Sequence, residues 1–417
     1  MEVTPIDLKE GRIQIENRNL FLDSDYFNID YTIEKDGKPI ASGAIDTHVP
    51  AGEAREVVLS ELNKDLFDGD GFYQLNVSYA LAEETNYAPK GYVLGFSQLT
   101  LPYTAKNLPD SLEGRFASLS KVANDYPYII MEEVDSEFVI SGDGFKISFN
   151  KETGWIEQYS VHQKNMLVEA IMPCFWRALT DNDLGNHMLE ECGVWRDMPN
   201  QMQLSDFELA SVDINEVSYI QVKSLYQLPI NDESFVAMTY LIDVEGRIKI
   251  TMDIKPSRSL PQIPAYGLMI QMNAEFDSLK WYGRGPHSNY SDRKESAYIG
   301  FFESTVKDEW VPYIRPQECG NKTDVRFMEV IDKKNLHGLQ IMASVPVEVT
   351  ALGFTPYEIE TYTHPHLMPD NPAKTVVRIN GYQRGIAGDD SWGAQPKKQY
   401  QISTEKNHRY EFVLAFK

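Results

Sequence analysis

The stretch Tyr26–Glu34, YFNIDYTIE, alternates between apolar and polar side chains, and Asp36-Gly37 follows it. Alternation with a period of two is typical of a strand with one buried face, and Asp-Gly is a strong signal for a tight hairpin. The same pattern recurs on both sides of this stretch, at residues 11–16, 39–45, 54–59, 71–81 and 92–101. Six or seven short strands at this spacing predict an immunoglobulin-like β-sandwich over residues 1–105.

A second, larger region of strand patterns begins after a segment rich in small and polar residues. We expect a linker at residues 106–125 and a second domain at residues 126–417. Strand patterns occur in this domain at residues 138–147, 218–228, 234–244, 247–254, 338–344 and 410–416. Residues 189–198 are the best helical candidate, with a weak period of 3.6. The prediction is an all-β chain whose second domain is one large antiparallel sandwich.

Charge and cysteine content exclude several classes of function. The 417 residues include 39 Lys and Arg against 62 Asp and Glu, a formal net charge of −23. That field repels phosphate backbones and anionic lipids, so we expect neither a nucleic-acid nor a membrane partner. Cys174, Cys192 and Cys319 form no C-x-x-C pair, which favours reduced thiols over disulfides or a zinc site. The first residues have no signal-peptide pattern, and we expect a cytoplasmic protein.

Common nucleotide-binding and hydrolase motifs are absent from the sequence. It contains no phosphate loop, no H-E-x-x-H and no G-x-S-x-G. Gly283-Arg284-Gly285 is followed by Pro286, which removes a backbone donor and bars a dinucleotide-type helix start.

Four clusters of polar and aromatic residues interrupt the strand patterns. Because such mixtures of Gly, Pro, Asn, Asp, Arg and Trp form loops, they are the candidate functional segments. We call them the first to fourth cluster: WRALTDNDLG at 176–185, WYGRGPHSNYSDRK at 281–294, YIRPQECGNKTDVRF at 313–327 and GIAGDDSWG at 385–393.

Each cluster also has a purely structural interpretation, in which its residues close turns or pair with one another. This interpretation assigns Asx-turns to Asp181, Asn182 and Asp183, an ion-pair network to Arg284, Asp292 and Arg293, a hydrogen-bonded structural role to His287, an ion pair to Glu318 and Arg326, and turns to Asp389 and Asp390.

Trp392 stands apart from these residues because its neighbours are small or polar. Gly388, the two aspartates and Gly393 give an indole ring little to pack against locally. The ring therefore either plugs a core from its loop or presents its face to a ligand. An indole face is a good platform for the C–H face of a pyranose.

The four clusters together resemble the C-terminal region of family 2 β-galactosidases, the lacZ-type enzymes. The patterns W-R-A-x-x-D-N-D-x-G, W-x-G-x-G-P-x-x-N-Y-x-D-R, P-Q-E-x-G-N-x-x-D-V-R and G-x-G-G-D-D-S-W match in order, with Ala387 at the first of the paired glycines. The matches lie within residues 170–395. The first 105 residues are similar to the family's last immunoglobulin-like domain, with weaker sequence support.

The resemblance implies a small sandwich followed by a galactose mutarotase-like supersandwich, and retaining hydrolysis of terminal β-D-galactosides such as lactose. That reaction needs two carboxyl groups about 5 Å apart. In the family both are glutamates of a preceding barrel domain, which also holds the magnesium and sodium ligands. We therefore assign no catalytic residue, metal ligand or cofactor to this chain. Trp392 matches the family's substrate-stacking tryptophan and is the one predicted substrate-binding residue.

The leading prediction is the C-terminal, non-barrel portion of a β-galactosidase, inactive alone. Its partners would be a β-galactoside and the barrel portion or a large subunit, and the intact enzyme would be oligomeric. One alternative is a non-catalytic galactoside-binding or small-subunit assembly module. Another is a free-standing aldose mutarotase, for which His287 and Glu318 are the nominal acid and base, without motif support.

Overall fold

The computed structural model describes residues 1–62, 66–67, 71–102, 129–214, 217–230, 233–390 and 392–416. The chain divides into two compact units, Met1–Ser111 and Leu112–Lys417. The linker expected at residues 106–125 lies outside the described residues. The predicted all-β fold is confirmed, and every strand pairing among the described residues is antiparallel.

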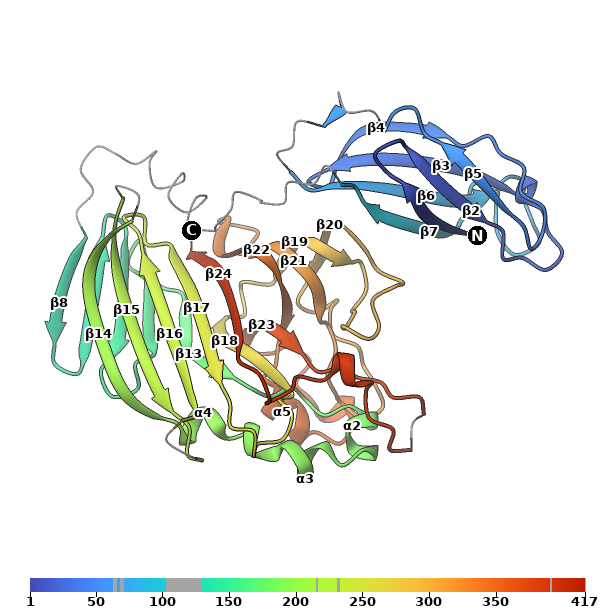
Figure 1. Cartoon of the computed structure of the whole chain (residues 1–417). Helices are drawn as coiled ribbons and strands as arrows, with labels where there is room; N and C mark the ends of the chain where they lie inside the picture. The colour runs from blue at the N-terminus through green and yellow to red at the C-terminus, as the bar shows by residue number, and fades with distance from the viewer. Residues whose placement is uncertain are drawn as a thin grey trace. The chain divides into compact units, whose positions relative to one another are not determined.

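The first unit is an immunoglobulin-like sandwich of two sheets, in the order β1-β2-β5 and β4-β3-β6-β7 (Figure 1). Ile29, Tyr31 and Ile33 of β3 are buried and alternate with more exposed neighbours, as the period of two requires. The strands are β1 (Glu2–Asp7), β2 (Arg12–Glu16), β3 (Phe27–Lys35), β4 (Lys38–Ala44), β5 (Ala54–Val58), β6 (Tyr73–Leu81) and β7 (Val93–Thr100), with the 3-10 turn η1 (Ser24–Tyr26).

The predicted hairpin at Asp36-Gly37 connects β3 to β4. Both residues adopt positive φ, 49° for Asp36 and 74° for Gly37, as a type I′ turn requires. The Asp36 side chain also accepts a hydrogen bond from the backbone N–H of Phe72 at 2.9 Å. The turn is therefore tied to the start of β6, which pairs with β3.

The second unit is a supersandwich built from one continuous antiparallel system of strands. Its earlier strands are β8 (Ile130–Val134), β9 (Glu137–Gly142), β10 (Phe145–Asn150), β11 (Ile156–Val161), β12 (Lys164–Asn165), β13 (Leu167–Cys174), β14 (Gln203–Ile214), β15 (Val217–Gln227), β16 (Phe235–Ile242) and β17 (Ile248–Lys255). Its later strands are β18 (Ala265–Asn273), β19 (Ser278–Gly285), β20 (Tyr298–Thr305), β21 (Lys322–Asp332), β22 (His337–Leu352), β23 (Lys374–Gln383) and β24 (His408–Phe416).

The strands of this unit form two ladders, one in each sheet layer. β14 to β17 pair in sequence order, and β24 then joins β17 to β22. In the other layer β13 pairs with β18, β18 with β23 and β23 with β22. The layers enclose a core of fully buried side chains that includes Trp176, Trp195 and Trp281.

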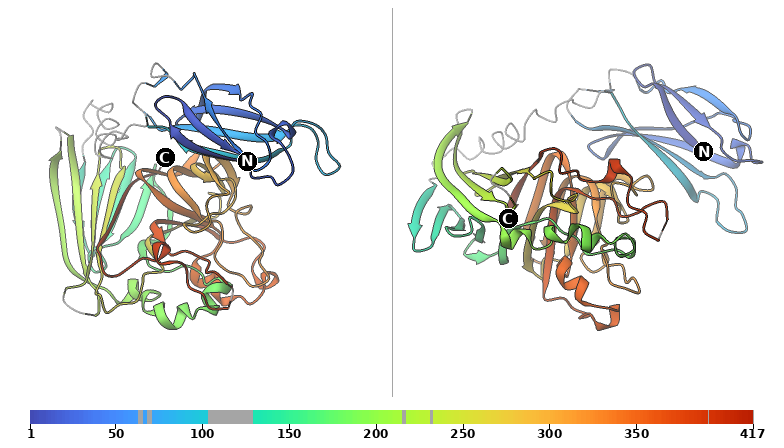
Figure 2. Two further views of the ribbon diagram at one scale, coloured as in Figure 1. Left: turned by 45° about the vertical axis from the view of Figure 1, so that its right-hand side comes forward. Right: turned by 60° about the horizontal axis from the view of Figure 1, so that its bottom comes forward.

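Short helices gather at one end of the unit, below the strands in Figure 1 and brought forward in the right-hand view of Figure 2. They are α2 (Asp181–Gly185), α3 (Met188–Cys192), η4 (Gly193–Trp195), α4 (Met198–Gln201), α5 (Pro356–Thr361) and η5 (Pro365–Leu367); η6 (Lys398–Tyr400) precedes β24. At the same end, the loop between β23 and η6 contains the fourth cluster (Figure 1).

Two predicted elements differ in detail. Residues 138–147 form the hairpin β9–β10 instead of one strand, because the chain turns at Asp143-Gly144, where Gly144 has a φ of 78°. Residues 189–198 do not form one helix. α3 ends before Gly193, a weak helix former, and a 3-10 turn then carries the Trp195 ring into the core.

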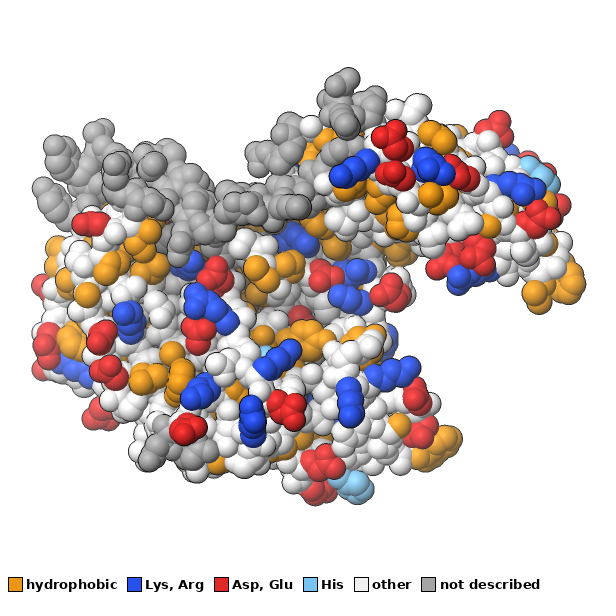
Figure 3. Space-filling model, in the orientation of Figure 1, with side chains coloured by type: hydrophobic (Ala, Val, Ile, Leu, Met, Phe, Trp, Pro, Cys, Tyr) orange, Lys and Arg blue, Asp and Glu red, His pale blue; other side chains and the backbone are white. Residues whose placement is uncertain are grey.

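Lysines and arginines are interspersed with aspartates and glutamates on the face shown in Figure 3, with no extended basic area. Among the described residues, no helix is both long and apolar enough to cross a bilayer.

Candidate functional site

The first cluster folds into α2 and the cap that starts it. The Thr180 hydroxyl accepts a hydrogen bond from the Asp183 N–H at 3.1 Å, and the Asp183 carboxylate accepts one from the Thr180 N–H at 3.0 Å. This reciprocal arrangement is a capping box, which satisfies backbone donors at a helix start. The structure therefore has a capped helix where the structural interpretation placed Asx-turns.

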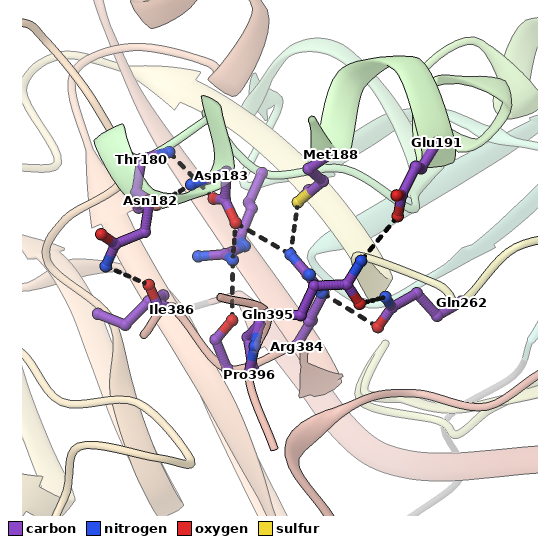
Figure 4. Close-up of polar contacts among 12 residues, drawn as sticks. Thr180, Asn182, Asp183, Met188, Glu191, Gln262, Arg384, Ile386, Gln395 and Pro396 are labelled. Carbon is purple, nitrogen blue, oxygen red and sulfur yellow. Dashed lines mark hydrogen bonds and ion pairs between the residues drawn. The ribbon is translucent and has the colours of Figure 1, made fainter. Parts of the chain in front are cut away.

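Asp183 also joins two buried arginines. Its Oδ1 accepts hydrogen bonds from Nη2 of Arg177 and Nη1 of Arg384, both at 3.0 Å. All three side chains are almost completely buried. Figure 4 shows Arg384 lying between Asp183, Met188 and Gln262, whose side-chain oxygen accepts from Arg384 Nε at 3.0 Å. Burial lowers the pKa of Arg384, and the nearby Asp183 carboxylate opposes that shift.

The fourth cluster begins at the residue after Arg384 and is held at its base. Nη2 of Arg177 donates to the carbonyl of Gly385 at 3.1 Å, and Nδ2 of Asn182 donates to the carbonyl of Ile386 at 3.0 Å (Figure 4). The backbone N–H of Ala387 donates to the carboxylate of Asp292, from the second cluster, at 2.9 Å. Three successive residues are therefore fixed by side chains from two other segments.

The far side of the same loop is held as well. Asp390 accepts hydrogen bonds from the backbone N–H groups of Trp392 at 2.8 Å and Ala394 at 3.3 Å, as expected of a turn-forming aspartate. The Gln395 amide donates to Glu191 of α3 at 2.9 Å and accepts from Gln262 at 3.2 Å (Figure 4). We call residues 385–390 and 392–396 the tryptophan loop.

Trp392 is 89% exposed at the end of this loop. The other two tryptophans of the clusters, Trp176 and Trp281, are fully buried. Their indole N–H groups donate to Glu360 at 2.7 Å and to the carbonyl of Arg284 at 3.1 Å. Of the two alternatives left open by the sequence, the structure therefore excludes the one in which Trp392 fills a core of this chain.

The third cluster supports the first and contains a different ion pair from the expected one. The amide of Gln317 donates to the Asp181 carboxylate at 3.0 Å and accepts from the Asp181 N–H at 3.2 Å. Glu318 pairs with Arg378 of β23, at 2.6 and 2.7 Å, and both side chains are buried. The expected pair with Arg326 is wrong, because Arg326 donates to the carbonyl of Asp324.

The second cluster is held by the third. Arg284 Nε donates to Asp324 at 2.5 Å, and Lys294 lies 3.3 Å from the same carboxylate. The expected network of Arg284, Asp292 and Arg293 is therefore incorrect in its partners. Asp292 instead binds the tryptophan loop, and Arg293 donates to the carbonyl of Ser288. Local sequence patterns did not predict that Asp324 pairs with Arg284, since the two residues lie 40 positions apart.

His287 has the expected hydrogen bond, because its Nε2 lies 3.0 Å from the hydroxyl of Ser296. His287 is exposed, whereas the Glu318 side chain is fully buried in its ion pair with Arg378. Glu318 therefore has no free oxygen facing solvent to act on a sugar. The structure gives no support to the acid–base pair of the mutarotase alternative.

Two cavities of the second unit differ in their relation to the clusters. One, of about 260 Å³, is lined by residues 291–296 of the second cluster and its continuation, together with Tyr400. It lies beside the base of the tryptophan loop, because Asp292 binds Ala387. The other, of about 550 Å³, is lined by Trp310, Phe354 and several prolines near the start of β23, and contains no residue of the four clusters.

The cysteines and acidic groups are the side chains that could take part in redox chemistry or bind a metal. Burial raises the pKa of Cys192 to about 11 and that of Cys319 to about 12, so both remain protonated thiols near neutral pH. Among the residues that the structure describes, no three His, Cys, Asp or Glu side chains are grouped as metal ligands.

The protein therefore consists of two all-β units. Its second unit has an exposed tryptophan on a loop that is held by hydrogen bonds from other segments. Residues 141–414 match the family model described as "Beta galactosidase small chain", and residues 13–102 match "Beta-galactosidase, domain 4". The chain belongs to the β-galactosidase small chain family.

Curated relatives named "Beta-galactosidase" align over almost the whole chain. The protein from Priestia megaterium is 32% identical over 99% of this chain, and that from Lactobacillus delbrueckii subsp. bulgaricus is 28% identical over 98%. The chain spans about 38% of the length of these relatives. Among solved structures, a galactose mutarotase-like protein from Lactobacillus casei covers 70% of this chain at 11% identity with a TM-score of 0.35.

Proposed function

We propose that this chain is the C-terminal, non-barrel portion of a retaining family 2 β-galactosidase, and that Trp392 completes its substrate site. The two catalytic glutamates, and the magnesium and sodium ligands, would belong to the remaining portion of the enzyme. That portion, or a separate large subunit, would be the partner of this chain in an oligomeric cytoplasmic enzyme.

The proposal rests on one observation at Trp392: its ring is exposed, whereas the loop that carries it is held by several hydrogen bonds. Exposing an indole to water forgoes the free energy gained by burying it, about 25 cal/mol for each Å² of apolar surface. The loop that carries this exposed ring is nevertheless held by side chains of α2, α3 and the second cluster. An exposed ring on a loop that is held in place is suited to a ligand that arrives from outside the chain.

Stacking suits a galactoside in particular. One face of a galactopyranose carries several C–H groups, and the electron-rich face of an indole attracts their weakly positive hydrogens. A neutral sugar is also compatible with the negative charge of the chain, which would repel an anionic ligand.

Nitrophenyl-galactoside hydrolysis tests the proposal at two levels. The chain alone should give no turnover, and mixing it with the remaining portion of the enzyme should restore turnover. In the reconstituted enzyme Trp392→Ala should lower kcat/KM about fivefold, since a stacking contact is worth about 1 kcal/mol. Trp392→Tyr should retain part of the activity. Robust turnover by the chain alone would refute the non-catalytic assignment, and unchanged kcat/KM in Trp392→Ala would refute the platform.

The binding-module alternative predicts a different result. Calorimetric titration of the isolated chain with galactose should show no measurable heat if the site needs the other portion. Millimolar or tighter binding by the isolated chain would favour an independent galactoside-binding module.

A further inference from the structure

We propose that Asp183 is a positioning residue for Trp392: its carboxylate joins Arg177 and Arg384 and so fixes the base of the tryptophan loop. The inference rests on the proposed role of Trp392 and extends it to a residue that touches no substrate.

Asp183 contacts both arginines that lie at the base of the tryptophan loop. Arg384 is the last residue before the tryptophan loop, and Arg177 donates both to Asp183 and to the carbonyl of Gly385 at 3.1 Å. One carboxylate oxygen therefore orients both guanidinium groups that hold the loop at its start. Figure 4 shows Asp183 and Arg384 facing each other.

Asp183 also balances the charges of these two arginines. Arg177 and Arg384 are two buried positive charges, and Asp183 supplies a negative charge to both. Removing one partner of a buried ion pair is costly because the other charge stays in the interior without compensation. Without the Asp183 charge, the two guanidinium groups would repel each other and move apart. The carbonyl of Gly385 would then lose the donor that holds it.

The helix α2 connects the base of the tryptophan loop to its tip. α2 contacts the tryptophan loop at both ends: Asn182 binds the carbonyl of Ile386, and Gly393 lies against the carbonyl of Gly185. A side chain added at Gly393, where φ is 129°, would place its Cβ 3.2 Å from that oxygen. Asp183 caps α2 through Thr180, so it also sets the position of the surface on which the loop rests.

The sequence offers a matched control for a buried aspartate. Asp243 is also fully buried, accepts from Arg247 Nε at 2.7 Å, and accepts from the backbone N–H groups of Glu245 and Arg247. It lies in the turn between β16 and β17, outside the four clusters. Asp243→Asn should therefore reproduce the general cost of neutralising a buried aspartate without affecting the tryptophan loop.

The first experiment needs no activity. The six tryptophans of the full chain are labelled with fluorotryptophan, and the Trp392 resonance is assigned through Trp392→Phe. In Asp183→Asn the Trp392 resonance should shift or narrow as the ring gains mobility. In Asp243→Asn it should not change. An unchanged Trp392 resonance in a folded Asp183→Asn protein would overturn the inference.

The second experiment is a double-mutant cycle in the reconstituted enzyme. Asp183→Asn should lower kcat/KM by at most the factor lost in Trp392→Ala, and should add less than about twofold in the Trp392→Ala background. Equal losses in both backgrounds would overturn the positioning role while leaving the stacking proposal intact. If Trp392→Ala alone has no effect, the proposed function fails, and the fluorine spectrum still decides whether Asp183 holds the loop.

A milder variant tests the inference even if Asp183→Asn does not fold. Asn182→Ala removes only the bond to the carbonyl of Ile386 and leaves both arginines paired. Its melting temperature should match that of the unsubstituted chain, while the Trp392 resonance moves in the same direction as in Asp183→Asn. A Trp392 resonance that does not move in Asn182→Ala would contradict the inference.

Discussion

Glu348 and Asn321 are joined by a buried hydrogen bond, in which Nδ2 of Asn321 donates to Oε2 of Glu348 at 2.8 Å. The other oxygen of Glu348 accepts from the backbone N–H of Gln383 at 3.3 Å. Asn321 also donates to the carbonyl of Asn289 and accepts from the Gln383 amide. The bond therefore links the second and third clusters to the end of β23, next to Arg384.

This buried carboxyl predicts a dependence of stability on pH. Burial raises the pKa of Glu348 from about 4.5 to about 7. Between these values the folded chain holds a proton that the unfolded chain has lost, so the free energy of unfolding falls as pH rises. This pKa shift corresponds to about 3 kcal/mol of unfolding free energy, which is lost fully once the pH lies above 7.

Urea denaturation at pH 5 and pH 8 measures this contribution. Glu348→Gln mimics the protonated side chain, so it should match the unsubstituted chain at pH 5 and be more stable at pH 8. The comparison between the two proteins cancels the effects of other titrating groups. Equal pH dependence in both proteins would contradict the assignment.

Gly388 predicts a loss of activity with little loss of stability. A Cβ at this position would collide with the carbonyl of Ala394 across the tryptophan loop. Gly388→Ala should therefore displace the loop, and kcat/KM of the reconstituted enzyme should fall by about as much as in Trp392→Ala. Ala387→Gly keeps the N–H that binds Asp292 and is the control that should remain active. Full activity of Gly388→Ala would show that the loop geometry is irrelevant.

The ion pair between Lys322 and Glu309 predicts a large effect on stability. Both side chains are buried, and the ammonium of Lys322 also lies 5.0 Å from the Trp281 ring centre. Burial lowers the pKa of Lys322, which opposes its charge unless Glu309 compensates. Glu309→Gln should lower the free energy of unfolding by about 3–5 kcal/mol. Glu303→Gln, which breaks an exposed pair with Lys280, should change it little.

The hairpin turn at Asp36-Gly37 predicts that one added methyl group lowers the stability of the first unit. Gly37 has a φ of 74°, a conformation that costs a residue with a side chain about 1 kcal/mol. Gly37→Ala should lower the stability of the first unit by that amount, measured by denaturant unfolding of the chain. Lys38→Ala, at the next position, is the matched control and should have little effect.

Much of the fold could be predicted from the sequence because strand alternation is a local property. The patterns at residues 26–34 and 54–59 correspond closely to β3 and β5. The helix expected at 189–198 was less predictable. Its periodicity spans Gly193, and the burial of Trp195 in the core, a tertiary effect, decides that the chain turns there.

The candidate site divides in the same way. Composition predicted loops for all four clusters, and in the fourth cluster Asp390 closes the turn that its neighbours suggest. In the other three clusters the prediction is partly wrong, because parts of them form α2, β19 and β21. The partners of the charged residues could not be identified. Glu318 has Arg326 close in sequence, yet it pairs with Arg378, which is 60 positions away and lies on β23. Ion pairing depends on which strands are adjacent, and local patterns do not specify that.

The sequence by itself determined that this chain is an acidic, all-β protein with four polar clusters and one tryptophan without local packing partners. Alternation, turn residues and composition act over a few residues, so they can be read directly along the chain. Only the tertiary structure decided that Trp392 is exposed while Trp176 and Trp281 are buried. It also brought Asp183 to Arg384, 201 positions apart, because burying two positive charges requires a carboxylate at that place.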